Sequence, residues 1–121
     1  MKQKVAVLGA SSNPERYSNK AIRMLLKYGH EVYPIHPLEK QIENLKTFSN
    51  LNEISEKLDT ITVYVGPKNI SPLIEAIVSA NPNRVIANPG AESDELKEAL
   101  ASASIPYIEA CTLVLLQTKQ F

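Results

Sequence analysis

The sequence has little of what marks disulfide-stabilised, nucleic-acid-binding or membrane-spanning proteins. Its single cysteine cannot form an internal disulfide, so a reducing cytoplasm is the expected location. Thirteen basic and thirteen acidic residues cancel, and no net field favours a nucleic acid or a membrane as a partner. No apolar run approaches the roughly 18 to 20 residues of a membrane span. The first four residues lead straight into a predicted strand, which predicts that no signal peptide is present.

Catalytic groups are also scarce. The chain has two histidines, His30 and His36, and no CxxC, HExxH or paired-carboxylate pattern, so neither a metal site nor a catalytic set is predicted. His30 follows Gly29 and precedes a predicted strand, so we interpret it as a turn residue. Cys111 is the one reactive candidate. The favoured interpretation of Cys111 is a small buried hydrophobe, and the alternative is a mixed disulfide with a thiol ligand.

What the sequence does contain is an alternation of apolar strands and amphipathic helices, over a length that fits one domain of residues 1–121. Strands are expected at residues 4–8, 31–35, 60–65, 84–87 and 106–109. Helices are expected at about residues 18–28, 52–58, 71–80 and 94–102. Gly29 is the expected end of the first helix, and Ser71 and Ser93 are the expected N-caps of the last two.

This order of elements predicts an α/β fold with a parallel sheet of about five strands. Right-handed crossovers would make it a doubly wound, three-layer domain. The strands carry Val, Ile and Tyr at most positions, which suits strands covered on both faces. The apolar tail 111–116 is compatible with an edge strand or a short helix, and also with a contact in a homodimer. The near-zero net charge does little to oppose such an association.

Four predicted loops lie where a ligand would bind, beyond the carboxyl ends of the strands. Each loop is rich in Gly, Pro, Ser or Asn, which allow tight turns and close approach of the backbone to a ligand. The first loop is longer than a minimal turn and precedes a helix, whose free N–H groups would meet a phosphate. The four loops are residues 9–17, 36–37, 66–68 and 88–91.

The first loop departs from the dinucleotide fingerprint Gly-x-Gly-x-x-Gly. At the three glycine positions this chain has Gly9, Ser11 and Pro14. The second strand ends in Ile35-His36, where no carboxylate is expected to hold the ribose hydroxyls. NAD is therefore disfavoured on two counts. A P-loop is excluded, because no Gly-Lys-Ser/Thr follows the first glycine.

A nucleotide with an extra ribose phosphate, such as NADP or coenzyme A (CoA), fits these loops better. Hydroxyl, amide and backbone groups of residues 11–13 would donate to phosphate oxygens. The extra phosphate would favour basic side chains, which Arg16, Lys20, His36 and Lys40 supply near the first helix and the end of the second strand.

Four segments resemble a known family. The loop Gly9-Ala10-Ser11-Ser12-Asn13-Pro14-Glu15-Arg16 resembles the opening loop of the small stand-alone CoA-binding proteins, which are similar to the CoA-binding domain of the succinyl-CoA synthetase alpha subunit. The likeness continues at residues 33–37, 88–92 and 109–114, in the same order, and so covers nearly the whole chain. His36 departs from the family, which commonly has Asn there. The resemblance implies a Rossmann-like fold with CoA lying across the carboxyl ends of the strands.

The resemblance also implies which residues hold the ligand. The loop would meet the diphosphate, and residues 36–40 would lie near the adenosine and its 3′-phosphate. Segments 65–67 and 88–90 would line the middle of the groove. The predicted ligand-binding residues are Gly9, Ala10, Ser11, Ser12, Asn13, Arg16, Lys20, His36, Pro37, Lys40, Val65, Gly66, Pro67, Asn88, Pro89 and Gly90.

The sequence thus favours a cytoplasmic protein that binds CoA or an acyl-CoA and catalyses no reaction alone. In the related synthetase a second domain supplies a phosphohistidine, and 121 residues are too few to include that domain. Two alternatives stay open. One is a small NAD(P)-binding, oxidoreductase-like domain, which the fold alone supports. The other is a protein-interaction domain that no longer binds a nucleotide and uses its apolar C-terminal run.

Overall fold

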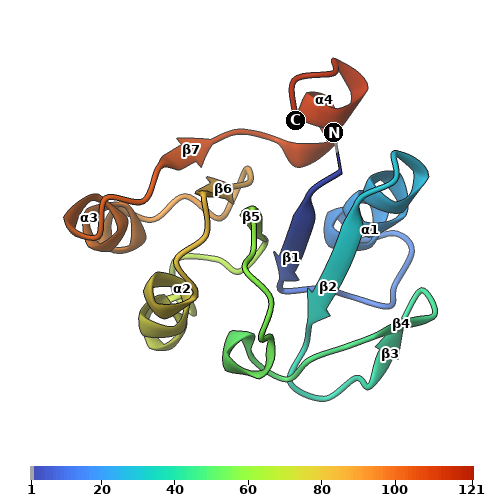
Figure 1. The fold of residues 1–121 in the computed structure, drawn as a ribbon, viewed down its shortest axis with the longest axis horizontal. Helices are drawn as coiled ribbons and strands as arrows, with labels where there is room; N and C mark the ends of the chain where they lie inside the picture. The colour runs from blue at the N-terminus through green and yellow to red at the C-terminus, as the bar shows by residue number, and fades with distance from the viewer. Residues whose placement is uncertain (1) are drawn as a thin grey trace.

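A five-stranded parallel sheet with helices on both faces forms the body of the molecule in the computed structural model, which describes residues 2–121 (Figure 1). Each strand pairs in parallel with its neighbours. The predicted α/β fold and its sheet are therefore confirmed. In spatial order the strands are β2 (Glu31–Ile35), β1 (Lys4–Leu8), β5 (Thr60–Val63), β6 (Arg84–Ala87) and β7 (Tyr107–Glu109).

Two helices cover each face of the sheet. Helices α1 (Tyr17–Lys27) and α4 (Thr112–Gln117) lie on one face, and α2 (Ile74–Ala80) and α3 (Asp94–Ser102) lie on the other (Figure 1). Strand β1 shows why both faces need cover. Its side chains alternate, so that Val5 and Val7 pack with α1 and α4, whereas Ala6 and Leu8 pack with α2 and α3.

The strand order reverses between β1 and β5. From β1 the chain crosses to β2 at one edge, and it later returns to add β5, β6 and β7 on the other side of β1. Such a switch point leaves the loops after its two strands diverging, and ligands of open α/β sheets bind in that crevice. The loops after β1 and β5 are therefore the expected walls of a site.

Three expectations about local structure were wrong. The expected helix over residues 52–58 is only a 3₁₀ turn, Leu51–Glu53, because the backbone at Ile54 is already extended. A 3₁₀ turn, Ser71–Leu73, precedes α2, and Ser71 does not cap it, because Ile70 before it is itself helical. Strand β5 ends at Val63, two residues earlier than expected.

The apolar tail forms the short helix α4, so the edge-strand alternative was wrong. Thr112 and Leu116 are buried against the rest of the domain, and Val114 is 50% exposed. Much of the tail therefore packs within its own chain, and its use in a homodimer stays a prediction. Within residues 2–121, no helix combines the length and the apolar composition that crossing a bilayer requires.

A small hairpin that the sequence did not predict follows β2. Its strands are β3 (Gln41–Ile42) and β4 (Leu45–Lys46). After the hairpin the chain returns to the end of β2 and forms a parallel bridge there, in which the Phe48 N–H donates to the Pro34 carbonyl and the His36 N–H donates to the Phe48 carbonyl, both at 2.9 Å. The segment between His36 and Phe48 therefore lies beyond the carboxyl end of β2.

Candidate functional site

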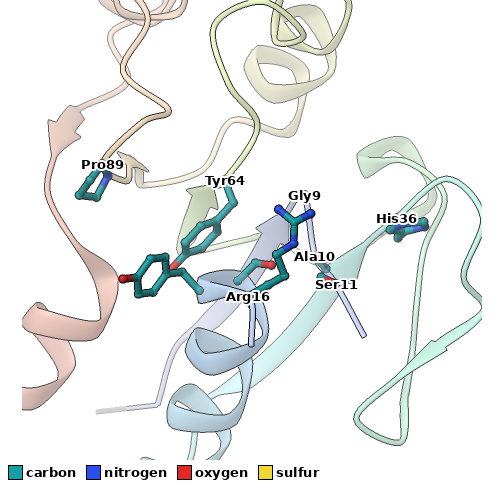
Figure 2. A pocket seen from close by; sticks show the side chains of 9 residues that line it. Gly9, Ala10, Ser11, Arg16, His36, Tyr64 and Pro89 are labelled. Atoms are coloured by element: carbon teal, nitrogen blue, oxygen red, sulfur yellow. The ribbon is translucent and has the colours of Figure 1, made fainter. Parts of the chain in front are cut away.

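A groove of about 470 Å³ lies at the carboxyl end of the sheet (Figure 2). It is formed by the loop after β1, the first turn of α1 and single residues that follow β2, β5 and β6. Its volume is within the roughly 300 to 1,000 Å³ typical of ligand sites. The lining residues are Gly9, Ala10, Ser11, Arg16, Tyr17, Ser18, His36, Tyr64 and Pro89.

Gly9 allows the two walls of the switch point to approach each other. It has φ of +88°, a conformation that favours glycine. A Cβ atom placed there would lie 3.0 Å from Val65 Cγ2 and 3.2 Å from the Tyr64 carbonyl carbon. A side chain at this position would therefore push the loop away from the segment after β5 and open the groove.

The N-terminus of α1 opens into the groove without a side-chain cap. Arg16 occupies the N-cap with an extended backbone and makes no capping hydrogen bond, and the first turn has no acidic residue. The Lys20 N–H donates to the Arg16 carbonyl at 3.0 Å, so the preceding amides of the first turn lie outside the helical ladder. Tyr17 and Ser18 of that turn line the groove. Amides that lie outside the helical ladder and the positive end of the helix dipole are the features that suit an anion.

Side-chain hydrogen bonds fix the loop before any ligand arrives. Ser11 Oγ accepts from the Asn13 N–H at 3.0 Å, and Asn13 Oδ1 accepts from the Glu15 N–H at 3.0 Å. Asn19, which is buried in α1, donates from Nδ2 to the Ser11 carbonyl at 2.9 Å. The Asn13 and Ser11 side chains thus hold the loop in place.

His36 presents a hydrogen-bond donor at one end of the groove. Its Nδ1 accepts from the backbone N–H groups of Leu38 and Glu39, each at 3.0 Å. These two bonds require a lone pair on Nδ1 and so place the ring proton on Nε2. His36 also lines a neighbouring cavity of about 350 Å³, to which Pro37 and Lys40 contribute.

A carboxylate two positions beyond residues 35–37, that of Glu39, contacts the first loop. Ser12 Oγ donates to Glu39 Oε1 at 2.6 Å, although the two residues are 27 positions apart. Glu39 Oε2 is buried and has no hydrogen-bond partner among residues 2–121. The Leu38 and Glu39 N–H groups, which donate to His36 Nδ1, turn the chain just after β2, and Glu39 then contacts the first loop.

Several predicted ligand residues lie outside the groove. Lys20 Nζ lies 5.3 Å from the ring centroid of Tyr17, and the Lys20 side chain lines a separate hollow on the flank of α1. Residues 65–67 support the site from behind: Val65 packs under Gly9, and the nearest atom to a Cβ placed on Gly66 would be the Gly90 carbonyl oxygen. The Gly90 N–H donates to Glu92 Oε1 at 2.8 Å.

Asn88 is buried in a hydrogen-bond network under α4. Its Nδ2 donates to Thr62 Oγ1 at 2.7 Å and to the Val63 carbonyl at 2.9 Å, and its Oδ1 accepts from the Thr112 N–H at 2.8 Å. Thr62 and Thr112 also bond to each other through their hydroxyls at 2.7 Å. The network joins β5, β6 and α4 at the floor of the site.

Tyr17, Ser18 and Tyr64 also line the groove, although they are not among the predicted ligand-binding residues. The signal for Tyr64 was available: it lies two positions after Thr62, on the same face of β5, where that strand ends at the switch point. Cys111 was also interpreted wrongly. It is partly exposed and lines a second cavity together with Tyr64, so it is not a small buried hydrophobe. Within residues 2–121, no three His, Cys, Asp or Glu side chains are grouped as metal ligands.

Comparisons with known proteins give a consistent result. A family model described as "CoA binding domain" matches residues 3–117. The protein YneT of Bacillus subtilis (strain 168), described as uncharacterized, is 24% identical over 98 residues, which are 81% of this chain and 73% of that protein. A crystal structure of an uncharacterized protein has a TM-score of 0.94 at 34% identity and covers 100% of this chain and 99% of its own. The alpha subunit of acetate–CoA ligase (ADP-forming) II from Pyrococcus furiosus is 31% identical over 65 residues, which are 53% of this chain and 14% of that subunit.

Proposed function

Because this chain belongs to the CoA-binding domain family, we propose that it binds CoA or an acyl-CoA in the groove at the switch point and catalyses no reaction by itself. The alpha subunit of acetate–CoA ligase, to which part of the chain is similar, is named for a reaction of CoA. A cytoplasmic location, where the single thiol stays reduced, is part of the proposal.

The uncapped N-terminus of α1 is the observation that carries the proposal. It opens into the groove beside Gly9 and Ser11, at the place where an α/β sheet of this order binds its ligand. Free amides and a helix dipole recognise the diphosphate of CoA, and Arg16 adds a positive side chain at the same wall. The rest of the ligand would then extend from this point in both directions along the groove.

The adenosine end fits the His36 side. The Nε2–H of His36 can donate to the nucleotide. The adjoining cavity is lined by Lys40 and Lys46, either of which can pair with a 3′-phosphate, and also by Glu39 and Glu53. His36 is not poised as a general base, because its Nδ1 already accepts two backbone hydrogen bonds. His30 comes just before β2 and so lies at the amino ends of the strands, away from the groove. Both placements support binding without catalysis.

Glu39 supports a second candidate ligand. A carboxylate beside the first loop is the group that holds an unphosphorylated ribose in dinucleotide sites, and Glu39 touches Ser12 of that loop. An NAD-like dinucleotide would use this contact, whereas a 3′-phosphate would be repelled by it. The two candidates therefore differ in how they respond to a phosphate on the ribose.

Thermal unfolding with separate ligands tests the proposal. The melting temperature is measured with CoA, acetyl-CoA, dephospho-CoA, NAD and NADP. A ligand at about 100 times its dissociation constant stabilises the fold by about 2.7 kcal/mol, or about 10 °C for a domain of this size. We expect shifts with CoA and acetyl-CoA. Shifts with NAD alone would support the second candidate, and no shift with any compound would favour the protein-interaction domain.

Ser11→Trp provides the matching variant, because a bulky side chain would fill the groove. Ser102→Trp is the control, since Ser102 is exposed at the end of α3, away from the carboxyl edge of the sheet. We expect Ser11→Trp to abolish the shift with CoA and Ser102→Trp to retain it. An equal shift in both variants would place CoA outside the groove.

A further inference from the structure

The charged residues of the four α-helices are divided unevenly between the two faces of the sheet. Helices α1 and α4 carry no anion, and their three cations all lie on α1: Lys20, Arg23 and Lys27. Helices α2 and α3 carry one cation, Lys97, and four anions: Glu75, Asp94, Glu95 and Glu98. All eight residues are exposed. The chain as a whole has no net charge, yet its helices form one basic face and one acidic face.

The three cations of α1 form the basic face. They follow one another at intervals of three and four residues, so they lie on the same side of the helix. Together with Met24 they line a hollow of about 340 Å³. The Arg23 guanidinium donates only to neutral oxygens, an amide and a backbone carbonyl, at 2.8 and 2.9 Å. Among residues 2–121 both ion pairs join an N-terminal lysine to Glu31, so no carboxylate pairs with the basic face.

The four anions of α2 and α3 form the acidic face, and they too lack an ion-pair partner among the described residues. Glu95 accepts from the hydroxyl of Ser71, a neutral donor, at 2.9 Å. That bond joins α3 to the 3₁₀ turn before α2, and the two helices are in contact. Their carboxylates therefore lie on one continuous surface.

The two charged faces lie on opposite sides of the molecule, as the positions of α1 and α3 in Figure 1 show. A two-fold dimer uses the same surface on both copies. It could therefore use only one of these faces, and it would bring like charges together there. A head-to-tail contact, in contrast, puts the basic face of one copy against the acidic face of the next.

We propose that α1 of one copy docks on α2 and α3 of the next, so that the chain associates with itself head to tail through its oppositely charged helix faces. The contact is separate from the apolar C-terminal run and does not depend on which ligand the groove binds. Each copy keeps one charged face free, so the contact builds a ring or a growing row of subunits. Exposed charges attract over about a Debye length, which makes the association sensitive to salt.

Sedimentation velocity over a series of protein concentrations tests the self-association. We expect the mean sedimentation coefficient to rise with concentration at about 0.01 M salt and to return to the monomer value at about 1 M salt. A protein that stays monomeric at low salt at every concentration would overturn the proposal. Association of equal strength at both salt concentrations would also overturn it, because an apolar contact would then be responsible.

Charge-swapped variants test whether these two faces make the contact. Lys20→Glu/Lys27→Glu leaves the chain with two acidic faces, and Glu75→Lys/Glu98→Lys leaves it with two basic faces. The replaced side chains are all exposed, so both variants should fold, which their melting temperatures check. Each variant alone should associate at least about tenfold more weakly than the wild type.

An equimolar mixture of the two variants should associate again, because every acidic face then meets a basic one. A mixture that stays monomeric under conditions where the wild type associates would show that the contact uses other surfaces.

Lys97→Glu is the matched control for Lys27→Glu. Both changes replace an exposed helix lysine by glutamate and alter the net charge equally. Lys97→Glu removes the one cation of α2 and α3, so it should strengthen the association by about two- to fivefold, whereas Lys27→Glu should weaken it by a similar factor. Weaker association in both variants would mean that net charge controls the assembly, and the proposed contact would be wrong.

Discussion

Asn88 contributes to the site by holding its walls together. All three of its side-chain hydrogen bonds go to the protein, and they join the ends of β5 and β6 to the first residue of α4. A residue that ends a strand at a ligand groove has the position expected of a binding residue. Its bonding capacity is nevertheless used by the fold, which only the three-dimensional arrangement reveals.

Gly9 is the residue whose substitution should be most costly at the site. Gly9→Ala combines a left-handed backbone with a Cβ atom 3.0 Å from Val65. Gly29→Ala is the matched control, because Gly29 has φ of +85° and a Cβ there would meet nothing within 4 Å. We expect Gly29→Ala to lower the free energy of unfolding by about 1 kcal/mol and Gly9→Ala by about 3 kcal/mol. Chemical denaturation measures both, and equal losses would contradict the steric argument.

At the scale of the element, a serine before a helix acts as its N-cap only where the serine is the last residue with an extended backbone. Ser93 caps α3 as expected, since it has an extended backbone and its Oγ accepts from the Leu96 N–H at 3.1 Å. Ser71 has the same sequence signature before Pro72 and does not act as a cap, because the chain is already helical at Ile70. Its hydroxyl donates instead to Glu95 of the neighbouring helix at 2.9 Å.

This difference leads to a paired prediction. Ser93→Ala should lower the free energy of unfolding by about 1 kcal/mol, because the Leu96 N–H loses its acceptor in a buried position. Ser71→Ala should change it by less than about 0.5 kcal/mol, because its only side-chain bond is exposed. Both free energies come from denaturant titration. A loss at Ser71 as large as that at Ser93 would mean that Ser71 supports the start of α2.

The strands and the loop after β1 were predictable because their signals are local. Apolar runs marked the five strands, and the order of strands and helices gave a parallel sheet. The hairpin β3–β4 was not predictable, because its turn uses Glu43 and Asn44 at positive φ (52° and 63°) instead of the usual Asn-Gly. Asn19 Nδ2 donates to Glu43 Oε2 at 3.2 Å, a contact that exists only in the folded chain.

The contact of Glu39 with the first loop could not be predicted from local signals. The sequence places Glu39 four residues after β2, with no sign that it returns to the first loop. In the folded chain Glu39 follows the turn at His36 and accepts from Ser12 Oγ, 27 positions away. The position of Glu39 thus depends on long-range geometry, whereas the loop before α1 depends on local signals.

At the scale of the whole molecule, the groove lies at the carboxyl ends of the strands and a second cluster of side chains lies at their amino ends. The cluster is made of Gln3, His30, Arg84 and Phe121, at the amino ends of β1, β2 and β6. The Gln3 N–H donates to His30 Nδ1 at 3.0 Å, and the His30 and Phe121 rings have centroids 5.2 Å apart. The Arg84 guanidinium lies 4.6 Å from the centroid of the Phe121 ring. The cluster joins the first and last described segments of the chain (Figure 1). Its contribution to the free energy of unfolding can therefore change without a change in the groove.

His30 should make the stability of the fold depend on pH through this cluster. Burial, with a smaller contribution from the nearby Arg84 charge, lowers the pKa of His30 below its usual value near 6.5. The unfolded chain then takes up a proton more readily than the folded one, so the stabilisation is complete above pH 6.5 and is lost as the pH falls through and below that value. Protonation of Nδ1 would also remove the acceptor of the Gln3 N–H.

We therefore expect the melting temperature to fall between pH 7.5 and pH 5.5, above the range in which ordinary carboxylates titrate. His30→Gln keeps a hydrogen-bond acceptor but has no titrating ring, so its melting temperature should fall less over the same interval. Because the cluster lies at the amino ends of the strands and the groove at their carboxyl ends, the affinity of the variant for CoA at pH 7.5 should equal that of the wild type. Parallel pH profiles for the two proteins would show that His30 is not the group responsible, and a loss of affinity would show that the two ends of the strands are coupled.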